Sequence, residues 1–279
     1  MSHPGVLQYL DDDGARIAFR DEGAGPALVL VHGWLLDSTQ WDGPAAAWRQ
    51  HFRVLRTDRR GFGASSGTPG LARDAADIVR LLDRLGIRRA GILGMSQGAR
   101  IALHLADSRP ERVTCLVLDG TPPLAGLPGN AGRPETPLSE YRERLARLGI
   151  DALRAELEAH PLMQLRAADP AARRALDAML ARYSGADLEA ATDPPPHVDA
   201  ERLARLDLPV LLLNGALDSS RRLAAGDALA RLVPGAERCL IPQAGHLACL
   251  DSRETYGAVV LEFLTRHLNQ WAATPGETP

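Results

Sequence analysis

The pentapeptide Gly94-Met95-Ser96-Gln97-Gly98 decides the fold of this chain. It lies between an apolar run at residues 90–93, which predicts a strand, and an amphipathic run at 99–106, which predicts a helix. A serine at so sharp a corner takes a strained backbone conformation that pushes its hydroxyl above the sheet edge. The flanking glycines are needed because strand and helix approach too closely there for a Cβ atom. An ordinary strand-to-helix loop would explain neither glycine, so the pattern predicts that Ser96 is a nucleophile.

The bulk composition excludes several classes of protein. The 279 residues fit one large α/β domain, or one such domain with an insertion. Lys and Arg number 32 against 35 Asp and Glu, which gives no electrostatic footprint for nucleic acid or an anionic membrane. The first 25 residues contain no apolar stretch of signal-peptide length, and no run approaches the roughly 20 residues of a membrane span. We therefore expect a soluble, cytoplasmic protein with neither nucleic acid nor membrane as partner.

The cysteines and other potential ligands indicate no cofactor. Cys115, Cys239 and Cys249 are odd in number, far apart and surrounded by apolar residues, as is typical of reduced core thiols. The sequence contains neither a cluster of His, Cys and carboxylates nor a glycine loop that could cradle phosphate. We expect neither a metal nor an organic cofactor.

Strands and helices alternate along most of the chain. The first two predicted strands flank Asp12-Asp13-Gly14, a hairpin turn signal, and the third is apolar on both faces, as in a covered parallel sheet. Strands are expected over residues 6–10, 15–20, 27–31, 53–57, 90–93, 112–120, 208–215 and 237–241. Helices are expected over 41–52, 71–85, 99–106, 221–232 and 255–268. This alternation predicts an α/β fold.

The alternation breaks between residues 121 and 206. This stretch has no strand-like run, only Pro and Gly clusters and helical pieces at 138–148, 151–159 and 170–183. Asp169 before Pro170 is a helix start, a capping side chain followed by the ring that tolerates the first turn. We expect residues 1–120 and 207–279 to form the core domain and 121–206 a helical cap, or lid, over the ligand-binding edge of the sheet. The alternative is a helical decoration far from the site.

At this point the chain resembles the α/β-hydrolase superfamily. The resemblance is carried by the Ser96 elbow, by His32-Gly33-Trp34, by the stretch from Asp58 to Ser65 (Asp-Arg-Arg-Gly-Phe-Gly-Ala-Ser), and by late Asp and His residues after the last two strands. Among relatives, it is similar to small carboxylesterases, enol-lactone hydrolases and the cofactor-free haloperoxidase or perhydrolase group. The resemblance implies a mostly parallel eight-stranded sheet flanked by helices, with a helical cap inserted after strand 6.

A serine hydroxyl is a poor nucleophile at neutral pH, so the chemistry requires a base within hydrogen-bond reach. His246 is the leading candidate because it follows the last strand and so returns to the same sheet edge as Ser96. The base needs a carboxylate to fix its tautomer, which the resemblance places between the serine and the histidine in chain order. Asp218 after the seventh strand fits this place, and Asp119 after the sixth is its rival.

The resemblance also implies an oxyanion hole built from backbone N–H groups. These would be the N–H of Gln97, the residue after the nucleophile, and that of Trp34 in the turn after the third strand. The ring of Trp34 either lines the acyl pocket or packs beneath the insertion. His32 is expected to brace the turn around Gly33, and residues 58–60 to form a structural corner rather than a catalytic one.

Serine at the elbow, rather than the Asp of dehalogenase-like and epoxide hydrolase-like relatives, implies an acyl-enzyme. The expected activity is hydrolysis of small-molecule carboxylic esters or lactones by Ser96, His246 and Asp218. Cleavage of a carbon–carbon bond next to a ketone, as in β-diketones, and perhydrolysis or cofactor-free haloperoxidase chemistry would reuse the same residues. A ligand receptor with vestigial catalysis is the remaining alternative, against which the intact set of three residues argues. The sequence leaves the oligomeric state open, a homodimer included.

Overall fold

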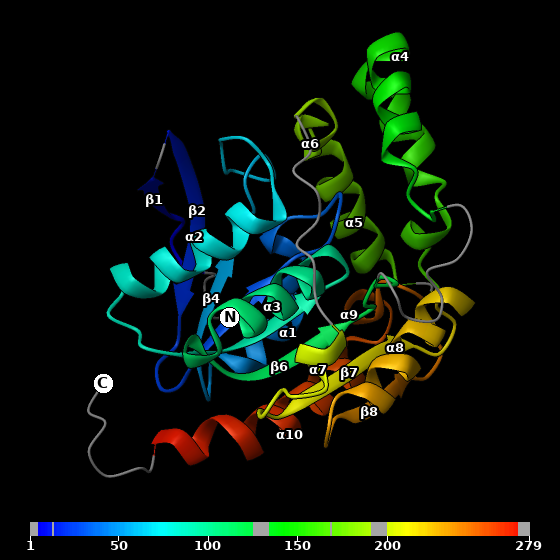
Figure 1. The fold of residues 1–279 in the computed structure, drawn as a ribbon. Coiled ribbons are helices and arrows are strands. Elements are labelled where there is room, and N and C mark those ends of the chain that lie inside the picture. Colours follow the sequence, from blue (N-terminus) through cyan, green and yellow to red (C-terminus); the bar gives the residue numbers. More distant parts are fainter. Residues whose placement is uncertain (1–4, 13, 125–133, 168, 191–199, 273–279) are drawn as a thin grey trace.

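The computed structural model describes residues 5–12, 14–124, 134–167, 169–190 and 200–272. Its strands form one eight-stranded sheet in the order β1-β2-β4-β3-β5-β6-β7-β8 (Figure 1). The strands are β1 (Gln8–Asp12), β2 (Ala15–Glu22), β3 (Ala27–Val31), β4 (Arg53–Thr57), β5 (Ala90–Met95), β6 (Val113–Asp119), β7 (Val210–Gly215) and β8 (Glu237–Ile241). All eight predicted strands are therefore present.

Strand direction within the sheet follows the expected pattern. β1 and β2 pair antiparallel as a hairpin, with Asp12 opposite Ala15, and β2 runs antiparallel to β4. Asp13, in the predicted turn, lies outside the described residues. The pairs β3–β4, β3–β5, β5–β6, β6–β7 and β7–β8 are all parallel. The prediction of a mostly parallel eight-stranded sheet is confirmed.

Helices cover both faces of the sheet and divide its core into two clusters. Successive residues of the central strands point to opposite faces, so that in β3 Leu28 and Leu30 join one cluster and Val29 and Val31 the other. The first cluster includes side chains of α1 (Asp42–Trp48) and α10 (Arg253–Ala272). The second includes side chains of α2 (Leu71–Arg84), α3 (Gln97–Ser108) and α8 (Ser220–Leu232). The central strands are apolar on both faces because each face is covered.

The helix predicted over residues 41–52 is shorter in the structure. Ser38–Trp41 is a 3-10 turn, η1, and α1 ends at Trp48 because the chain must reach β4, where the Arg53 N–H donates to the Pro26 carbonyl at 3.0 Å. Sequence analysis missed five elements of three or four residues, which are too short for a periodicity to show. They are α6 (Ala186–Glu189), α7 (Ala200–Leu203), α9 (Ala248–Asp251), η2 (Pro110–Arg112) and η3 (Pro161–Met163).

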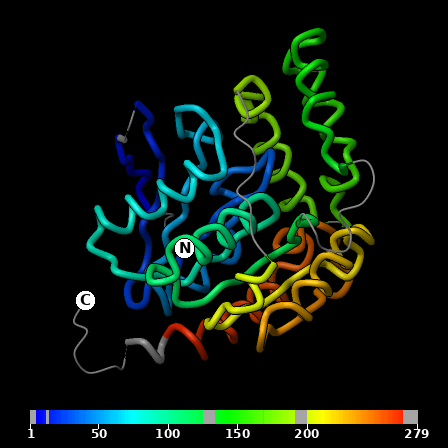
Figure 2. The backbone as a smooth tube through the Cα atoms, viewed as in Figure 1, coloured from blue at the N-terminus to red at the C-terminus, as the bar shows by residue number. Residues whose placement is uncertain are grey.

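The described part of residues 121–206 contains helices and no strand. α4 (Leu138–Glu158) is kinked at Gly149, whose φ of 77° is left-handed. The two helices predicted here are therefore the two segments of α4 on either side of this kink. α5 (Pro170–Arg182) begins as predicted, with the Asp169 side chain accepting from the Ala171 N–H. α4, α5 and α6 stand together at one end of the molecule, away from α10 (Figures 1 and 2).

Within the described residues, no helix combines the length and the apolar character that crossing a bilayer requires.

Candidate active site

Ser96 occupies a strained corner between β5 and α3. Its φ of 55° and ψ of −112° are rare for a residue with a side chain, and its N–H donates to the Asp119 carbonyl at 2.8 Å. A Cβ atom added at Gly94 would collide with the Gly98 carbonyl, and one added at Gly98 with the Val31 carbonyl. The predicted reason is therefore confirmed for Gly94, which faces the start of α3, whereas Gly98 is required by the approach of α3 to β3, the neighbouring strand.

His246 and Asp218 meet beyond the ends of the last two strands. His246 Nδ1 lies 3.1 Å from Asp218 Oδ2, which also accepts from Asn214 Nδ2 at 3.0 Å. The second carboxylate oxygen of Asp218 accepts from the Ser219 N–H at 2.7 Å. Because the acceptor is a carboxylate, Nδ1 of the imidazole carries the proton and Nε2 keeps its lone pair. A histidine in this tautomer can accept a proton at Nε2.

The electrostatics of this pair favour an anionic Asp218 and a neutral His246. Burial alone would raise the pKa of Asp218, but the charge and hydrogen bond of His246 and the charge of Arg222 bring it down to about 2. Burial, and next the charge of Arg222, lower the pKa of His246, and Asp218 only partly offsets them. The imidazole is therefore unprotonated and available as a base at neutral pH.

Asp119, the rival carboxylate, stands apart from this arrangement. It ends β6 and is fully buried. Burial, assisted by the charge of Asp218, raises the pKa of Asp119 to about 8, with Tyr256 and Arg222 acting against it. Asp119 is thus mostly protonated at neutral pH, whereas Asp218 is the carboxylate bonded to the imidazole.

Arg222, on the first turn of α8, was missed by the sequence analysis. This arginine is buried, and its Nη1 donates to Ser96 Oγ at 3.1 Å and to the Gly120 carbonyl at 2.7 Å. Its Nε pairs with Glu135, just before α4, at 2.9 Å. The only available signal was its place four residues after Asp218, one turn further along the chain. That spacing gave no reason to expect a contact with Ser96.

The turn after β3 is braced as predicted. The Arg59 N–H donates to His32 Nε2 at 3.0 Å, so His32 Nδ1 carries the proton and donates to the Gly33 carbonyl at 2.8 Å. Trp34 and Gln97, the two predicted oxyanion-hole residues, both line the pocket described below. Gln97 is the first residue of α3, where a backbone N–H has no intrahelical partner.

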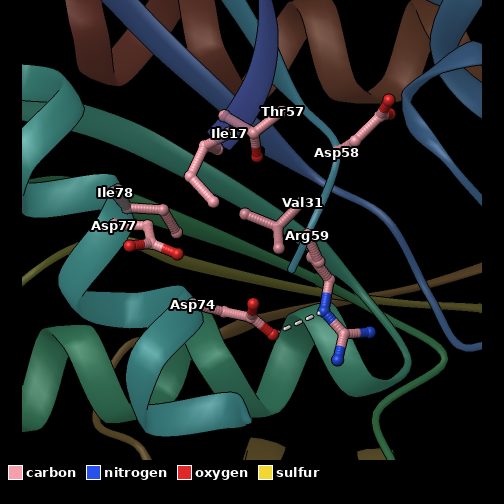
Figure 3. Close-up of a pocket in the computed structure, with 8 residues that line it drawn as sticks. All are labelled: Ile17, Val31, Thr57, Asp58, Arg59, Asp74, Asp77 and Ile78. Atoms are coloured by element: carbon pink, nitrogen blue, oxygen red, sulfur yellow. Dashed lines mark hydrogen bonds and ion pairs between the residues drawn. The ribbon is translucent and has the colours of Figure 1, made fainter. Parts of the chain in front are cut away.

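Residues 58–60 form the expected structural corner. Asp58 accepts from the Ser38 and Ala64 N–H groups, at 2.7 and 2.8 Å. Figure 3 shows the guanidinium of Arg59 turned toward Asp74 on α2, with Nε and Oδ2 2.8 Å apart. The small cavity around these side chains, about 10 Å³, has room for roughly one water molecule. Arg59 also donates to the Gln97 side chain at 3.0 Å, and so links the corner to the Ser96 elbow.

A cavity of about 510 Å³ opens onto Ser96 and His246. Its wall combines the turn after β3, the start of α3 and residues of α4 and η3, the last including Leu162 and Met163. The Trp34 ring lines this cavity and also packs beneath the inserted helices, with its Nε1 donating to Asp187 at 2.8 Å and its centroid 5.5 Å from that of Tyr141. The ring therefore packs beneath the insertion, which is one of the two predicted alternatives, and whether it contacts an acyl group stays a prediction. The volume is that of a small-molecule site.

The three cysteines form no disulfide. Cys115 and Cys249 are buried and Cys239 half-buried, and all three are free thiols, as predicted. No group of three or more His, Cys, Asp or Glu side chains there is placed to hold a metal ion.

The fold and the site define a class of protein. A family model described as alpha/beta hydrolase fold matches residues 26–252, and the chain belongs to that family. It is 31% identical over 261 residues to the pimeloyl-[acyl-carrier protein] methyl ester esterase of Nitrosomonas europaea, covering 87% of this chain and 97% of that protein.

Two solved structures are also similar to this chain. A hydrolase from Pseudomonas aeruginosa superposes with a TM-score of 0.76 at 32% identity, covering 93% of this chain and 98% of that one. A thermophilic esterase from Thermogutta terrifontis, with malate bound, superposes with a TM-score of 0.79 at 26% identity, covering 95% and 99% of the two chains.

Proposed function

We propose that this chain is a serine hydrolase that cleaves carboxylic esters, or lactones, of small molecules through an acyl-enzyme. The observation that carries the proposal is the meeting, at one cavity, of a strained Ser96 with a His246 that is oriented by Asp218. Ser96 is the nucleophile, His246 the general base and Asp218 the carboxylate that holds the imidazole. Relatives named as esterases support the reaction class.

The direction in which Ser96 gives up its proton follows from the hydrogen bonds of its hydroxyl group. A hydroxyl has one hydrogen to donate and lone pairs to accept with, and Arg222 already donates to one lone pair of Ser96 Oγ. The hydroxyl hydrogen is left for another acceptor, and in our proposal that acceptor is Nε2 of His246, a residue that lines the same cavity. As Oγ attacks the carbonyl carbon, His246 takes this proton, and Asp218 stabilises the resulting imidazolium.

The tetrahedral intermediate requires donors for its oxyanion. In our proposal these are the backbone N–H groups of Gln97 and Trp34. On collapse, the carbon–oxygen bond to the alcohol breaks and His246 returns the proton to the leaving oxygen, which leaves Ser96 acylated. A water molecule, deprotonated by His246, then attacks the acyl carbon, and the carboxylic acid is released with Ser96 restored.

We further propose that residues 121–206 act as the lid of this site, with residues 1–120 and 207–279 as the catalytic core. Leu138 and Arg142 of α4 and Leu162 and Met163 of η3 supply part of the cavity wall. A wall of this kind reduces the water around the reacting carbonyl and shapes the acyl pocket. The alternative, a decoration remote from the site, is disfavoured by these lining residues.

The test is the variant Ser96→Ala. We expect turnover of p-nitrophenyl acetate to fall to the uncatalysed rate while the circular dichroism spectrum and the melting temperature stay those of the parent protein. Turnover that survives in a folded Ser96→Ala protein would reject the scheme. A panel of short-chain esters, lactones and β-diketones separates the proposed activity from carbon–carbon cleavage, since a preference for the diketone would displace the ester assignment.

A further inference from the structure

The side chains that line the cavity above Ser96 include more positively than negatively charged groups. Among the described residues, the lining of the cavity includes four arginines and a single carboxylate, Asp187; the arginines are Arg59, Arg100, Arg142 and Arg222. Asp187 is already engaged, since it accepts from Trp34 Nε1 at 2.8 Å and from the Tyr183 hydroxyl at 2.7 Å. Burial also raises the pKa of Asp187, which weakens its value as a counter-charge.

Two of these arginines are paired within the fold. Arg59 is bound to Asp74 at 2.8 Å and Arg222 to Glu135 at 2.9 Å. Arg142 is exposed to solvent, and its Nε donates to the Leu188 carbonyl. Arg100 differs from these three arginines. Its Nη2 donates to the Pro123 carbonyl at 2.8 Å, its buried Nε has no hydrogen-bond partner, and no carboxylate of the described residues forms an ion pair with it.

The surroundings of Arg100 make an unpaired positive charge unfavourable. Arg100 lies in the first turn of α3, at the positive end of the helix dipole, where cations are disfavoured. Burial and the neighbouring charge of Arg222 both lower its pKa. Two arginines, Arg100 and Arg222, therefore line one cavity beside a helix N-terminus, and among the described residues Glu135 is the only carboxylate that forms an ion pair with either of them. An anion in the cavity would relieve this repulsion.

We propose that Arg100, together with Arg222, forms a carboxylate subsite, and that the preferred substrates are esters that also carry a free carboxylate, such as half-esters of short dicarboxylic acids. This inference rests on the proposed ester hydrolase function. A guanidinium offers parallel N–H donors that match the two oxygens of a carboxylate. Arg222 already touches Ser96 Oγ, so a carboxylate held there lies only a few bonds from the attacked carbonyl, and short chains fit.

The experiment compares methyl hydrogen glutarate with an amide analogue in which the carboxylate is replaced by a carboxamide, by methanol release. The parent protein should show a kcat/KM about tenfold or more higher for the half-ester, since charge-assisted hydrogen bonds are involved. Arg100→Gln should lower the ratio of the two kcat/KM values by a similar factor, mainly through KM, and Arg100→Lys should keep part of it. Arg109→Gln, an exposed arginine at the far end of α3, is the matched control and should leave both values unchanged.

A second readout does not depend on turnover. Isothermal titration calorimetry should detect glutarate binding to the parent protein and to Arg109→Gln, weakened about tenfold or more in Arg100→Gln. Equal kcat/KM for the half-ester and the amide in the parent protein would overturn the inference, as would unchanged glutarate binding in Arg100→Gln. If no ester is hydrolysed at all, the proposed function fails, and glutarate binding alone still decides whether the carboxylate subsite exists.

Discussion

Replacement of Asp218 by Asn should remove most of the activity without unfolding the protein. In the structure Asp218 Oδ2 accepts from two donors, His246 Nδ1 at 3.1 Å and Asn214 Nδ2 at 3.0 Å, while Oδ1 accepts from the Ser219 N–H. An Asn that keeps the Ser219 bond turns its NH₂ group toward both donors. The imidazole then has to present its Nδ1 lone pair and carry its proton on Nε2, where it can no longer take the proton of Ser96.

The size of the effect follows from the loss of that tautomer and of the carboxylate charge. The equivalent change in serine proteases lowers kcat about 10⁴-fold, which corresponds to roughly 5 kcal/mol of transition-state stabilisation. We expect a loss of about this size in kcat for p-nitrophenyl acetate at neutral pH, with the circular dichroism spectrum unchanged.

Asp119→Asn is the matched control for this substitution. Because Asp119 has a pKa of about 8, it is mostly protonated at neutral pH and Asn is close to it in charge and shape. The kcat of the Asp119→Asn protein should stay within about tenfold of the parent value. The reasoning is refuted if Asp218→Asn retains kcat within tenfold of the parent, or if Asp119→Asn loses as much as Asp218→Asn.

Three further predictions concern residues close to His246 and Asp218. Arg222→Gln removes a charge that lowers the pKa of His246, so the acid limb of the kcat/KM profile should move to higher pH; an acid limb that stays in place or moves lower would contradict this. Gly120→Ala puts a Cβ 2.7 Å from His246 Cε1 at a left-handed φ of 54°, so kcat should fall more than tenfold, and thermal unfolding should show about 1–2 kcal/mol of lost stability; parent-like kinetics would argue against the geometry. Folding raises the pKa of Asp119 from 3.8 to about 8, so between these pH values the folded protein keeps a proton that the unfolded chain releases. This group alone therefore lowers the free energy of unfolding by roughly 1.4 kcal/mol for each pH unit as the pH rises through that range. In denaturant unfolding, the free energy of unfolding of Asp119→Asn should fall less than that of the parent protein as the pH rises across that range. An equal fall in the two proteins would contradict the prediction.

The elements that sequence analysis predicted correctly are those with a strong local cause. The corner at Ser96 was predictable because the Gly-x-Ser-x-Gly pattern between a strand and a helix is local, and Gly94 makes its close approach within that pentapeptide, although Gly98 approaches Val31 of β3. The central strands were predictable because burial on both faces demands continuous apolar runs. The kink of α4 at Gly149 was visible as an interruption between two amphipathic pieces, and the structure shows the two pieces joined.

What sequence analysis missed depends on contacts between distant parts of the chain. Asp119 and Asp218 both follow a parallel strand, and only the folded structure shows which of them reaches His246. Arg222 lies on a helix 126 residues beyond Ser96 and looks like any other surface-helix arginine in the sequence. That Arg100 has no acidic partner among the described residues is likewise a property of its surroundings in space and not of its neighbours in the chain.

The most direct test of the account is covalent labelling with a fluorophosphonate probe, followed by mass spectrometry of the peptides. We expect the parent protein to form a single adduct, rapidly, on the hydroxyl of Ser96. Labelling should be much slower in Asp218→Asn and absent in Ser96→Ala. A parent protein that takes up no probe, or one that is labelled equally well after Ser96→Ala, would contradict the claim that this serine is an activated nucleophile.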